Sequence, residues 1–436
     1  MSFQQGLSGL NGAAKSLDVI GNNVANASTV GFKQSQAQFA DMYANSMNRS
    51  GNSPVGIGVT VANVAQSFTQ GNVTSTNNPL DIAINGDGFF QLSSSLDNSS
   101  PMYGRNGQFQ LDKNGYIVNP SMNGAYLMGW AAGSSGGDPV ALQINTSSIP
   151  ATTTTTISTK VNLDSRLSVP TTTPFNAADP TTYNNSTGVT IYDSLGNPYS
   201  VQTYYVKNAA TGTPPTTTWD VYATVDGKTL TTTTGGTTPL KLGSMVFNST
   251  GTLTSTLDST GTAIASGNIP IDLTTAGTNA GVVKAGGVFA STIALNYAGS
   301  TQTGSAFVNL AQSQNGMAPG TLSSFSIDKD GTIVGSYSNQ QTKNLGTVVL
   351  VNFANPNGLQ PLGNNLYQAT AAAGSPLVGQ PTTGTFGTLQ ARAVEDSNVD
   401  LTAELVNMIV AQRVYQANSQ TIKVQDTVLQ TLVSLR

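Results

Sequence analysis

Both ends of this 436-residue chain carry apolar residues at helical spacing, in contrast to the long stretch between them. Near the start these residues recur three, four or seven positions apart and so share one side of a helix: Phe3, Leu7, Leu10, Ala14, Leu17 and Val24. A longer stripe, free of Gly and Pro, lies within 399–436 and includes Leu405, Val406, Ile409, Val410, Val414, Val424, Val428, Leu432 and Leu435. We expect Asp400 or Thr402 to cap the start of this second helix.

Each helix needs a partner, because an isolated amphipathic helix gains most of its stability from packing. One interpretation is that each helix packs separately on a domain core. The position of the helices at the two ends of the chain favours a second interpretation, in which they pack on each other. Each apolar stripe has its best-matched partner at the opposite end. We therefore expect either an intramolecular coiled coil or one strand of a larger bundle.

The composition argues against several classes of function. Only 9% of the residues are charged and the formal net charge is −4, which leaves no basic surface for nucleic acid. Neither Cys nor His is present, which removes disulfides, thiol nucleophiles, Ser-His-Asp catalysis and the usual zinc sites. No apolar run reaches the roughly 20 residues that span a bilayer, and the start of the chain lacks the pattern of a cleaved signal peptide. We predict no enzyme, no cofactor, no metal site and no membrane insertion.

Between the helices, alternating apolar residues and frequent turn residues are typical of antiparallel strands. Residues 79–92 are expected to form a strand, a Gly-rich turn and a second strand. A weak repeat relates 109–118 to 325–334, and each copy reads as a hairpin with a Gly (Gly115 or Gly331) where φ is positive. This likeness predicts that both flanks build one all-β domain, interrupted by an insertion.

We therefore predict a multidomain, mainly β chain with paired, coiled-coil-like terminal helices and two β-rich domains, the outer one inserted in the inner one. The predicted parts are a terminal helical domain (1–27 with 397–436), a connecting segment (28–72 with 388–396), an inner β domain (73–147 with 319–387) and an outer inserted β domain (148–318). Alternating strands separated by Gly and Asp turns predict a sandwich or an open barrel for the insertion.

Two motif matches have simple structural explanations. Residues 133–137 match a G-x-S-x-G nucleophile elbow, but they lie in a Gly/Ser run of a chain without His, and we expect a loop. The turns at 112–115 and 328–331 resemble the opening of a calcium loop but lack its bidentate Glu, and we expect hairpin turns.

The most specific stretch is 22–33, which we expect to end the first helix. Its Asn side chains can bind their own backbone and tolerate left-handed geometry, and its Gly permits a chain reversal. The residues singled out are Asn22, Asn23, Asn26, Gly31, Phe32 and Lys33.

With these residues in view, the chain resembles the bacterial flagellar rod and hook family, and most closely its hook proteins. The resemblance is specific over about 1–147 and 319–436 and loose over the insertion. It is carried by the blocks 17–33, 78–90, 337–342, 350–356, 358–363, 395–401 and 404–413.

The resemblance implies a structural subunit that polymerises into a bendable helical tube, the hook, which transmits torque from rod to filament as a universal joint. Implied partners are other copies of the chain, the distal rod protein, the hook cap, the hook–filament junction proteins and the type III export apparatus. The implied location is the flagellar hook outside the cell, reached without a cleaved signal peptide. A distal rod subunit is the alternative, although the large insertion argues against it.

Overall fold

The computed structural model describes residues 2–43, 56–134, 136–232, 236–274, 286–289 and 291–434. Leu435 lies outside these residues, and so does the side chain of Leu432. The chain forms two compact units, the first from 1–146, 323–336 and 342–436 and the second from 147–322 with 337–341.

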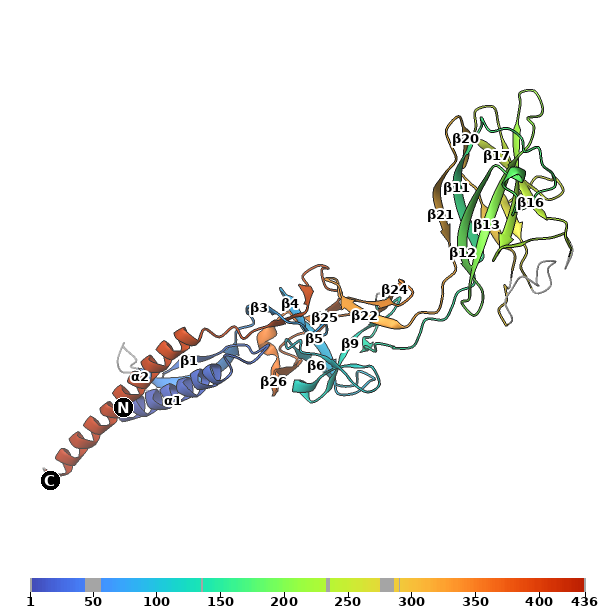
Figure 1. The fold of residues 1–436 in the computed structure, drawn as a ribbon. Helices are drawn as coiled ribbons and strands as arrows, with labels where there is room; N and C mark the ends of the chain where they lie inside the picture. The colour runs from blue at the N-terminus through green and yellow to red at the C-terminus, as the bar shows by residue number, and fades with distance from the viewer. Residues whose placement is uncertain are drawn as a thin grey trace. The chain divides into compact units, whose positions relative to one another are not determined.

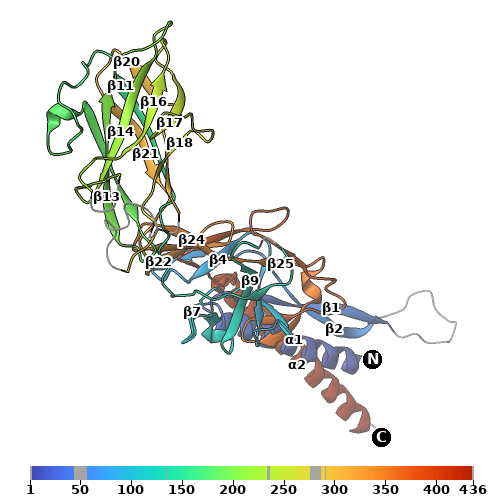
Figure 2. The ribbon, with the colours of Figure 1, turned by 90° about the vertical axis from the view of Figure 1, so that its right-hand side faces the viewer.

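Two long helices begin and end the first unit. Helix α1 (Ser2–Ala25) and helix α2 (Leu401–Ser434) run side by side, as the ribbons at the two chain ends show (Figures 1 and 2). Asp400 caps α2, because its Oδ1 accepts hydrogen bonds from the backbone N–H groups of Thr402 (2.9 Å) and Ala403 (3.1 Å). The predicted helices and the Asp400 cap are confirmed.

A long antiparallel hairpin packs against α1. It consists of β1 (Ser35–Tyr43) and β2 (Gly56–Gln66), which form a two-stranded sheet and pair with no other described strand (Figure 2). A two-stranded hairpin is marginally stable on its own. Its contacts with α1, including those of Phe39 and Val59 beside Gly12, therefore hold it in place.

The β part of the first unit is built around one 13-stranded sheet. Its main path runs β22-β23-β24-β9-β5-β6-β27-β26, and five short strands pair at its sides. The bounds are β5 (Phe89–Ser93), β6 (Pro101–Gly104), β7 (Gln110–Leu111), β8 (Ile117–Asn119), β9 (Ala125–Ala131), β10 (Val140–Ala141), β22 (Leu322–Ile327), β23 (Thr332–Tyr337), β24 (Thr342–Val348), β25 (Leu350–Asn352), β26 (Gln360–Gly363), β27 (Leu366–Gln368) and β28 (Leu377–Gly379). Short 3₁₀ turns occur at η1 (Pro120–Met122) and η4 (Pro356–Gly358).

Two further strand pairs tie the C-terminal part of the chain to earlier segments. Strand β4 (Ile82–Asn85) pairs with β29 (Thr388–Ala391), and β3 (Val73–Ser75) pairs with β30 (Ala393–Glu395). The strands predicted within 79–92 are therefore present as β4 and β5, but they pair with other strands rather than with each other.

The internal repeat forms two hairpins of the same sheet. Strand β7 pairs with β8 and β22 lies beside β23, and the turns place Gly115 at φ 82° and Gly331 at φ 84°. The prediction that both flanks of the insertion build one β domain is confirmed.

The second unit is a β-sandwich. One sheet has the order β18-β19-β11-β20 with β21 also paired to β11, and the other has the order β12-β13-β14-β16-β17 with β15 beside β14. The bounds are β11 (Thr156–Asp164), η2 (Pro180–Thr182), β12 (Asn185–Tyr192), β13 (Pro198–Lys207), β14 (Thr217–Val225), β15 (Lys228–Thr229), β16 (Lys241–Phe247), β17 (Leu253–Asp258), β18 (Asn268–Ile271), β19 (Ile293–Asn296), β20 (Thr301–Thr303) and β21 (Val308–Gln314). Trp219, Tyr205 and Tyr297 are buried in the core that the two sheets share.

Gly31 makes the reversal after α1. Its φ is +70°, and a Cβ there would lie 2.7 Å from the backbone N of Asn106. The stretch 22–33 ends the first helix as predicted, and Asn22, Asn23 and Asn26 do so without adopting positive φ. Because α1 extends to Ala25, the chain reverses only afterwards, at Gly31.

We expect Gly31→Ala to lower the free energy of unfolding of the first unit by about 2 kcal/mol or more, since both φ and the space are unsuitable. Gly21→Ala is the matched control, because a Cβ there meets nothing within 4 Å and Ala favours a helix. The free energy of unfolding of each variant is measured by urea unfolding, with amide exchange of residues 82–131 as the probe. Equal effects of the two variants would contradict this account of Gly31.

Candidate assembly interface

The two helices contact each other through small residues. A Cβ at Gly6 would lie 3.2 Å from Cγ1 of Ile422, and one at Gly9 would lie 2.8 Å from Oδ1 of Asn418. A larger side chain at Gly9 would therefore force the Asn418 side chain of α2 to move. The face of α1 that packs inside the first unit also includes Ala13, Val19 and Ile20, which are buried.

The large apolar side chains of the helices lie mostly outside this contact. Val410 is 54% exposed, in contrast to Ala411 beside it at 8%. The exposed set comprises Phe3, Leu7, Leu401, Leu405, Val406, Ile409, Val410, Val414, Tyr415, Val424, Val428 and Leu429. Of the other predicted stripe residues, Leu10, Leu17 and Val24 are half-buried. Within one subunit the two stripes thus do not cover each other.

A cleft of about 810 Å³ opens between α1, α2 and the β1–β2 hairpin. Gly9, Gly12 and Ala13 line it from α1, and Val410 and Val414 line it from α2. Small residues on one wall and apolar side chains on another make this cleft suitable for apolar side chains of another molecule.

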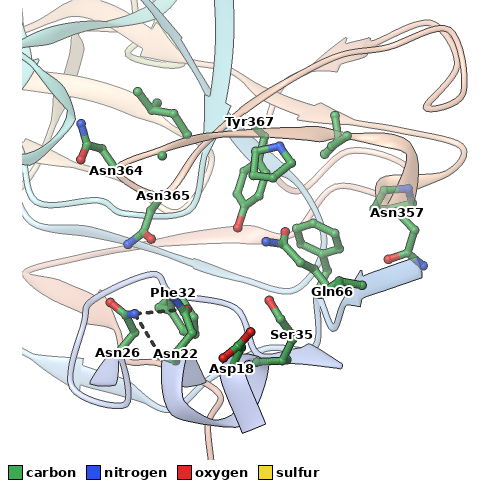
Figure 3. A pocket seen from close by; sticks show the side chains of 18 of the residues that line it. Asp18, Asn22, Asn26, Phe32, Ser35, Gln66, Asn357, Asn364, Asn365 and Tyr367 are labelled. Carbon is green, nitrogen blue, oxygen red and sulfur yellow. Dashed lines mark hydrogen bonds between the residues drawn. The ribbon is translucent and has the colours of Figure 1, made fainter. Parts of the chain in front are cut away.

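A second groove, of about 630 Å³, lies where α1 ends, and Figure 3 shows it from close by. Asn22, Asn26 and Phe32 line one side, and Asn365 and Tyr367 line the other. The Asn26 amide donates to the backbone O of Asn22 (3.0 Å), as expected for a helix end. These motif residues therefore shape the helix end and its surface.

Asn23 joins α1 to β1. Its side chain is 1% exposed, its Nδ2 donates to the Ser35 carbonyl (2.8 Å), and its Oδ1 accepts from the Ser35 N–H (2.9 Å). The same amide lies 3.3 Å from Oε2 of Glu404 on α2. Asn23 thus fixes the positions of three elements through hydrogen bonds that only an amide can make.

Glu395 lies at the centre of a region that we call the junction, made of residues 31–35, 69–75, 105–106 and 393–404. Its Oε1 accepts from Nζ of Lys33 (2.7 Å) and from the backbone N–H of Gly71 (2.9 Å). Its Oε2 lies 3.4 Å from an Nη1 of Arg105, and all three side chains are at most 2% exposed. We call Lys33, Arg105 and Glu395 the ion cluster.

The ion cluster holds two cations and one carboxylate. Burial lowers the pKa of the Lys33 amine, Glu395 raises it and Arg105 lowers it, and the net shift is downward. Nearby, burial raises the pKa of the Tyr367 phenol to about 12, although Arg105 and Gln66 lower it in part. Tyr367 therefore stays neutral near pH 7 and does not balance the second cation.

Glu404 supports the same junction from the first turn of α2. It is 3% exposed, and its Oε1 accepts from Nε2 of Gln34 at 2.7 Å. Asn398 adds to the link, because its Oδ1 accepts from the Gln34 N–H (2.8 Å) and its Nδ2 donates to the Ser67 carbonyl (2.8 Å). Both glutamates of the chain are thus buried where its two ends meet.

The sequence motif included Lys33 but did not identify Arg105, Glu395 or Glu404 as its partners. The available signal was the scarcity of Glu, since both examples lie within ten positions of each other at the start of the C-terminal helix. Within the described ranges, no group of three Asp, Glu, His or Cys could hold a metal ion. Among those same residues, no helix is both long and apolar enough to cross a membrane.

Comparison with known protein families assigns both ends of the chain and the continuous stretch 83–317. Residues 83–164 match the flagellar hook protein FlgE/F/G D1 domain, and 162–317 match the flagellar basal body protein FlaE D2 domain. The ends match two further families, the flagella basal body rod protein (3–33) and the flagellar basal body rod FlgEFG protein C-terminal region (390–435).

Full-length relatives decide between the members of this group. The flagellar hook protein FlgE of Escherichia coli is 44% identical over 443 residues, which cover 100% of both chains. The chain belongs to the flagellar hook protein family. The hook protein FlgE of Borreliella burgdorferi is 32% identical over 468 residues, covering 100% of this chain and 99% of the relative. These hook relatives give the distal rod alternative no support, and family membership places the chain in the flagellum.

A solved structure shares the fold of this hook protein. The crystal structure of Helicobacter pylori flagellar hook protein FlgE2 matches with a TM-score of 0.53 at 14% identity, covering 74% of this chain and 100% of that one. Over the matched part of the chain, the mainly β architecture is therefore shared with that hook protein.

The lowered pKa of Lys33 predicts how stability depends on pH. Because the folded state binds this proton less tightly than the unfolded state, stability rises with pH from the lowered pKa up to 10.5, the ordinary value. We expect the wild type to gain stability relative to Lys33→Met between about pH 8 and about pH 10. Urea unfolding of the first unit at the two pH values measures this gain. A pH dependence that is the same in both proteins would contradict the assignment.

Proposed function

We propose that the exposed apolar sides of α1 and α2 polymerise this hook subunit into a bendable helical tube. The observation that supports this most directly is the set of large side chains on α2 that remain about half exposed in one subunit. Contiguous apolar surface of this kind marks an interaction site. On one long helix, it fits a partner that repeats along the helix, which another copy of the chain supplies.

The free energy gained by burying each side chain is modest, but it accumulates along the polymer. Full burial of a Val or Leu side chain contributes about 1.5–3 kcal/mol, so covering a half-exposed one contributes about 1 kcal/mol. Roughly a dozen such residues per subunit can offset the loss of rotational and translational freedom on association. The same gain recurs with each added subunit.

The contact has two different sides, which suits an open polymer. One side is the cleft between α1, α2 and the β1–β2 hairpin, and the other is the row of exposed side chains from Val424 to Leu429. When unlike surfaces meet and the rotation does not close, the product is a helix rather than a ring. We infer that apolar side chains of one copy enter the cleft of the next.

The remaining assignments follow from membership in the hook family. We infer a non-enzymatic building block, exported by the flagellar type III apparatus without a cleaved signal peptide. Its inferred contacts are the distal rod protein, the hook cap and the hook–filament junction proteins. The proposed parts are those predicted from the sequence, with 1–27 and 397–436 forming the inner tube.

Val410→Asp is expected to abolish polymerisation while the β sheets stay folded, because a carboxylate in an apolar contact costs several kcal/mol. Val410→Leu is the matched control and should assemble, since the contact stays apolar. Negatively stained samples show whether tubes form, and circular dichroism shows whether the subunit is folded. Normal tubes from Val410→Asp would refute a role for this face of α2.

We further propose that the second unit sets the stiffness and shape of the tube. Two of its carboxylates are engaged internally, Asp164 with Arg166 (2.8 Å) and Asp220 with Lys241 (3.7 Å). Most of the remaining polar surface consists of hydroxyl and amide groups. Such groups exchange partners through water at little net cost, whereas specific ion pairs between subunits define one register.

Replacing 150–316 by a short Gly/Ser bridge should therefore leave tubes that assemble but are straighter or mechanically altered. The measurement is the curvature and bending stiffness of isolated tubes, compared with those of the full-length chain. If the first unit is folded and no tubes form, the second unit builds the lattice rather than adjusting it.

A further inference from the structure

We propose that the buried carboxylate of Asp193 anchors the two chain segments that enter and leave the second unit to its sandwich. We call these segments, residues 147–155 and 314–322, the stem, and residues 193–197 the anchor turn. The proposal concerns the second unit alone. It rests on the proposed function only for its consequence, namely that bending of the tube leaves the stem paired and attached to the sandwich.

The stem is a paired ribbon rather than two separate linkers. Ile149 and Gly320 exchange backbone hydrogen bonds of 2.8 and 3.1 Å, and Thr152 and Met317 exchange bonds of 3.0 and 2.8 Å. A two-stranded ribbon is marginally stable on its own. Its pairing therefore depends on what it packs against in the second unit.

The anchor turn lies directly against both segments of the stem. Gly196 has a φ of +80°, and a Cβ there would overlap Cδ of Pro319 and lie 3.0 Å from Cβ of Ala151. Next to the turn, the stem residue Thr154 is fully buried. Its N–H donates to the backbone O of Tyr192 (2.9 Å), and its Oγ1 accepts from the Tyr192 N–H (2.9 Å). The start of the turn and the stem thus share one hydrogen-bonded contact.

Asp193 holds the anchor turn in shape and is itself fully buried. Its Oδ1 accepts from the N–H groups of Leu195 (2.9 Å) and Asn197 (2.9 Å). Its Oδ2 accepts from Nδ2 of Asn197 (2.9 Å) and from the phenol of Tyr199 (3.0 Å), and a Cβ at Gly287 would overlap it. Burial raises the pKa of the Asp193 carboxyl, but these hydrogen bonds lower it, and the net shift is downward. The carboxylate is thus held as an anion that joins the turn to the strand after it.

The same turn recurs elsewhere in the chain with a less buried first residue. Asp112, Asn248 and Asp258 each precede a Gly by three positions, and the Oδ1 of each accepts from the N–H groups two and four positions on at 2.7–3.0 Å. In the Asn248 turn an amide does this as well as a carboxylate. The Oδ1 bonds therefore belong to the turn wherever it occurs, and Asp193 adds full burial and the two side-chain donors at Oδ2.

The experiment measures amide exchange of the monomeric full-length chain at Thr152, Thr154 and Met317 of the stem, with strand β14 of the sandwich as the reference. Asp193→Ala should speed exchange of the stem amides by at least about tenfold more than exchange of β14, because it leaves buried donors without an acceptor. Asp258→Ala is the matched control, since it removes the same two Oδ1 bonds from a half-buried turn. It should change exchange of the stem by less than about threefold.

Equal acceleration of the stem and of β14 in Asp193→Ala would overturn the proposal, because the carboxylate would then stabilise the sandwich as a whole. Unchanged exchange of the stem would overturn it too. If Asp193→Ala does not fold, Tyr199→Phe is measured in its place. That variant removes one donor to Oδ2 and keeps the ring, and it should speed the stem relative to β14 by about threefold or more. Exchange is measured on the monomer, so the result does not depend on whether the second unit sets the stiffness of the tube.

Discussion

The carboxylate of Glu395 lies where both ends of the chain meet the sheet of the first unit, and the arrangement of that unit depends on it. In a protein with 9% charged residues, a fully buried group of three charges is costly to place, and loss of a single member leaves a buried charge without its partner. The junction around it fixes where α1 ends, where α2 begins and which strands lie next to them. The helices thus leave the sheet in a defined direction rather than through a flexible linker.

The helix pair distributes its side chains unusually. Glycine and alanine on α1 allow the close approach of α2, whereas most of the larger Val, Leu and Ile residues of α2 remain at the surface. A monomer built for stability alone would bury the large residues, since they contribute more free energy per side chain. The observed choice leaves most of the apolar surface available to other subunits. In the assembly that we propose, the helices carry the polymer contacts, and the junction connects them to the rest of the subunit.

The two β parts follow a more familiar plan. In the first unit, aromatic rings of Phe89, Tyr103, Phe353 and Tyr367 pack edge to face with centroids 4.8–6.1 Å apart. The second unit closes a sandwich over Trp219 and its neighbours. These cores are complete within one subunit, in contrast to the helix pair. Assembly can thus alter the surroundings of the helices while the β cores keep their packing.

The sequence by itself determined the terminal helices, a cap at either Asp400 or Thr402, the paired hairpins of the repeat and membership in the hook family. All of these depend on local periodicity, turn chemistry or motifs, which neighbouring residues encode. Only the tertiary structure decided that β4 and β5 pair with other strands, that Gly6 and Gly9 rather than Phe3 and Leu7 face α2, and that Arg105 shares Glu395 with Lys33. Periodicity shows that a helix has an apolar side, but which neighbour covers it depends on contacts between residues hundreds of positions apart. The partner of a buried charge is decided in the same way, because segments distant in sequence must first be brought together.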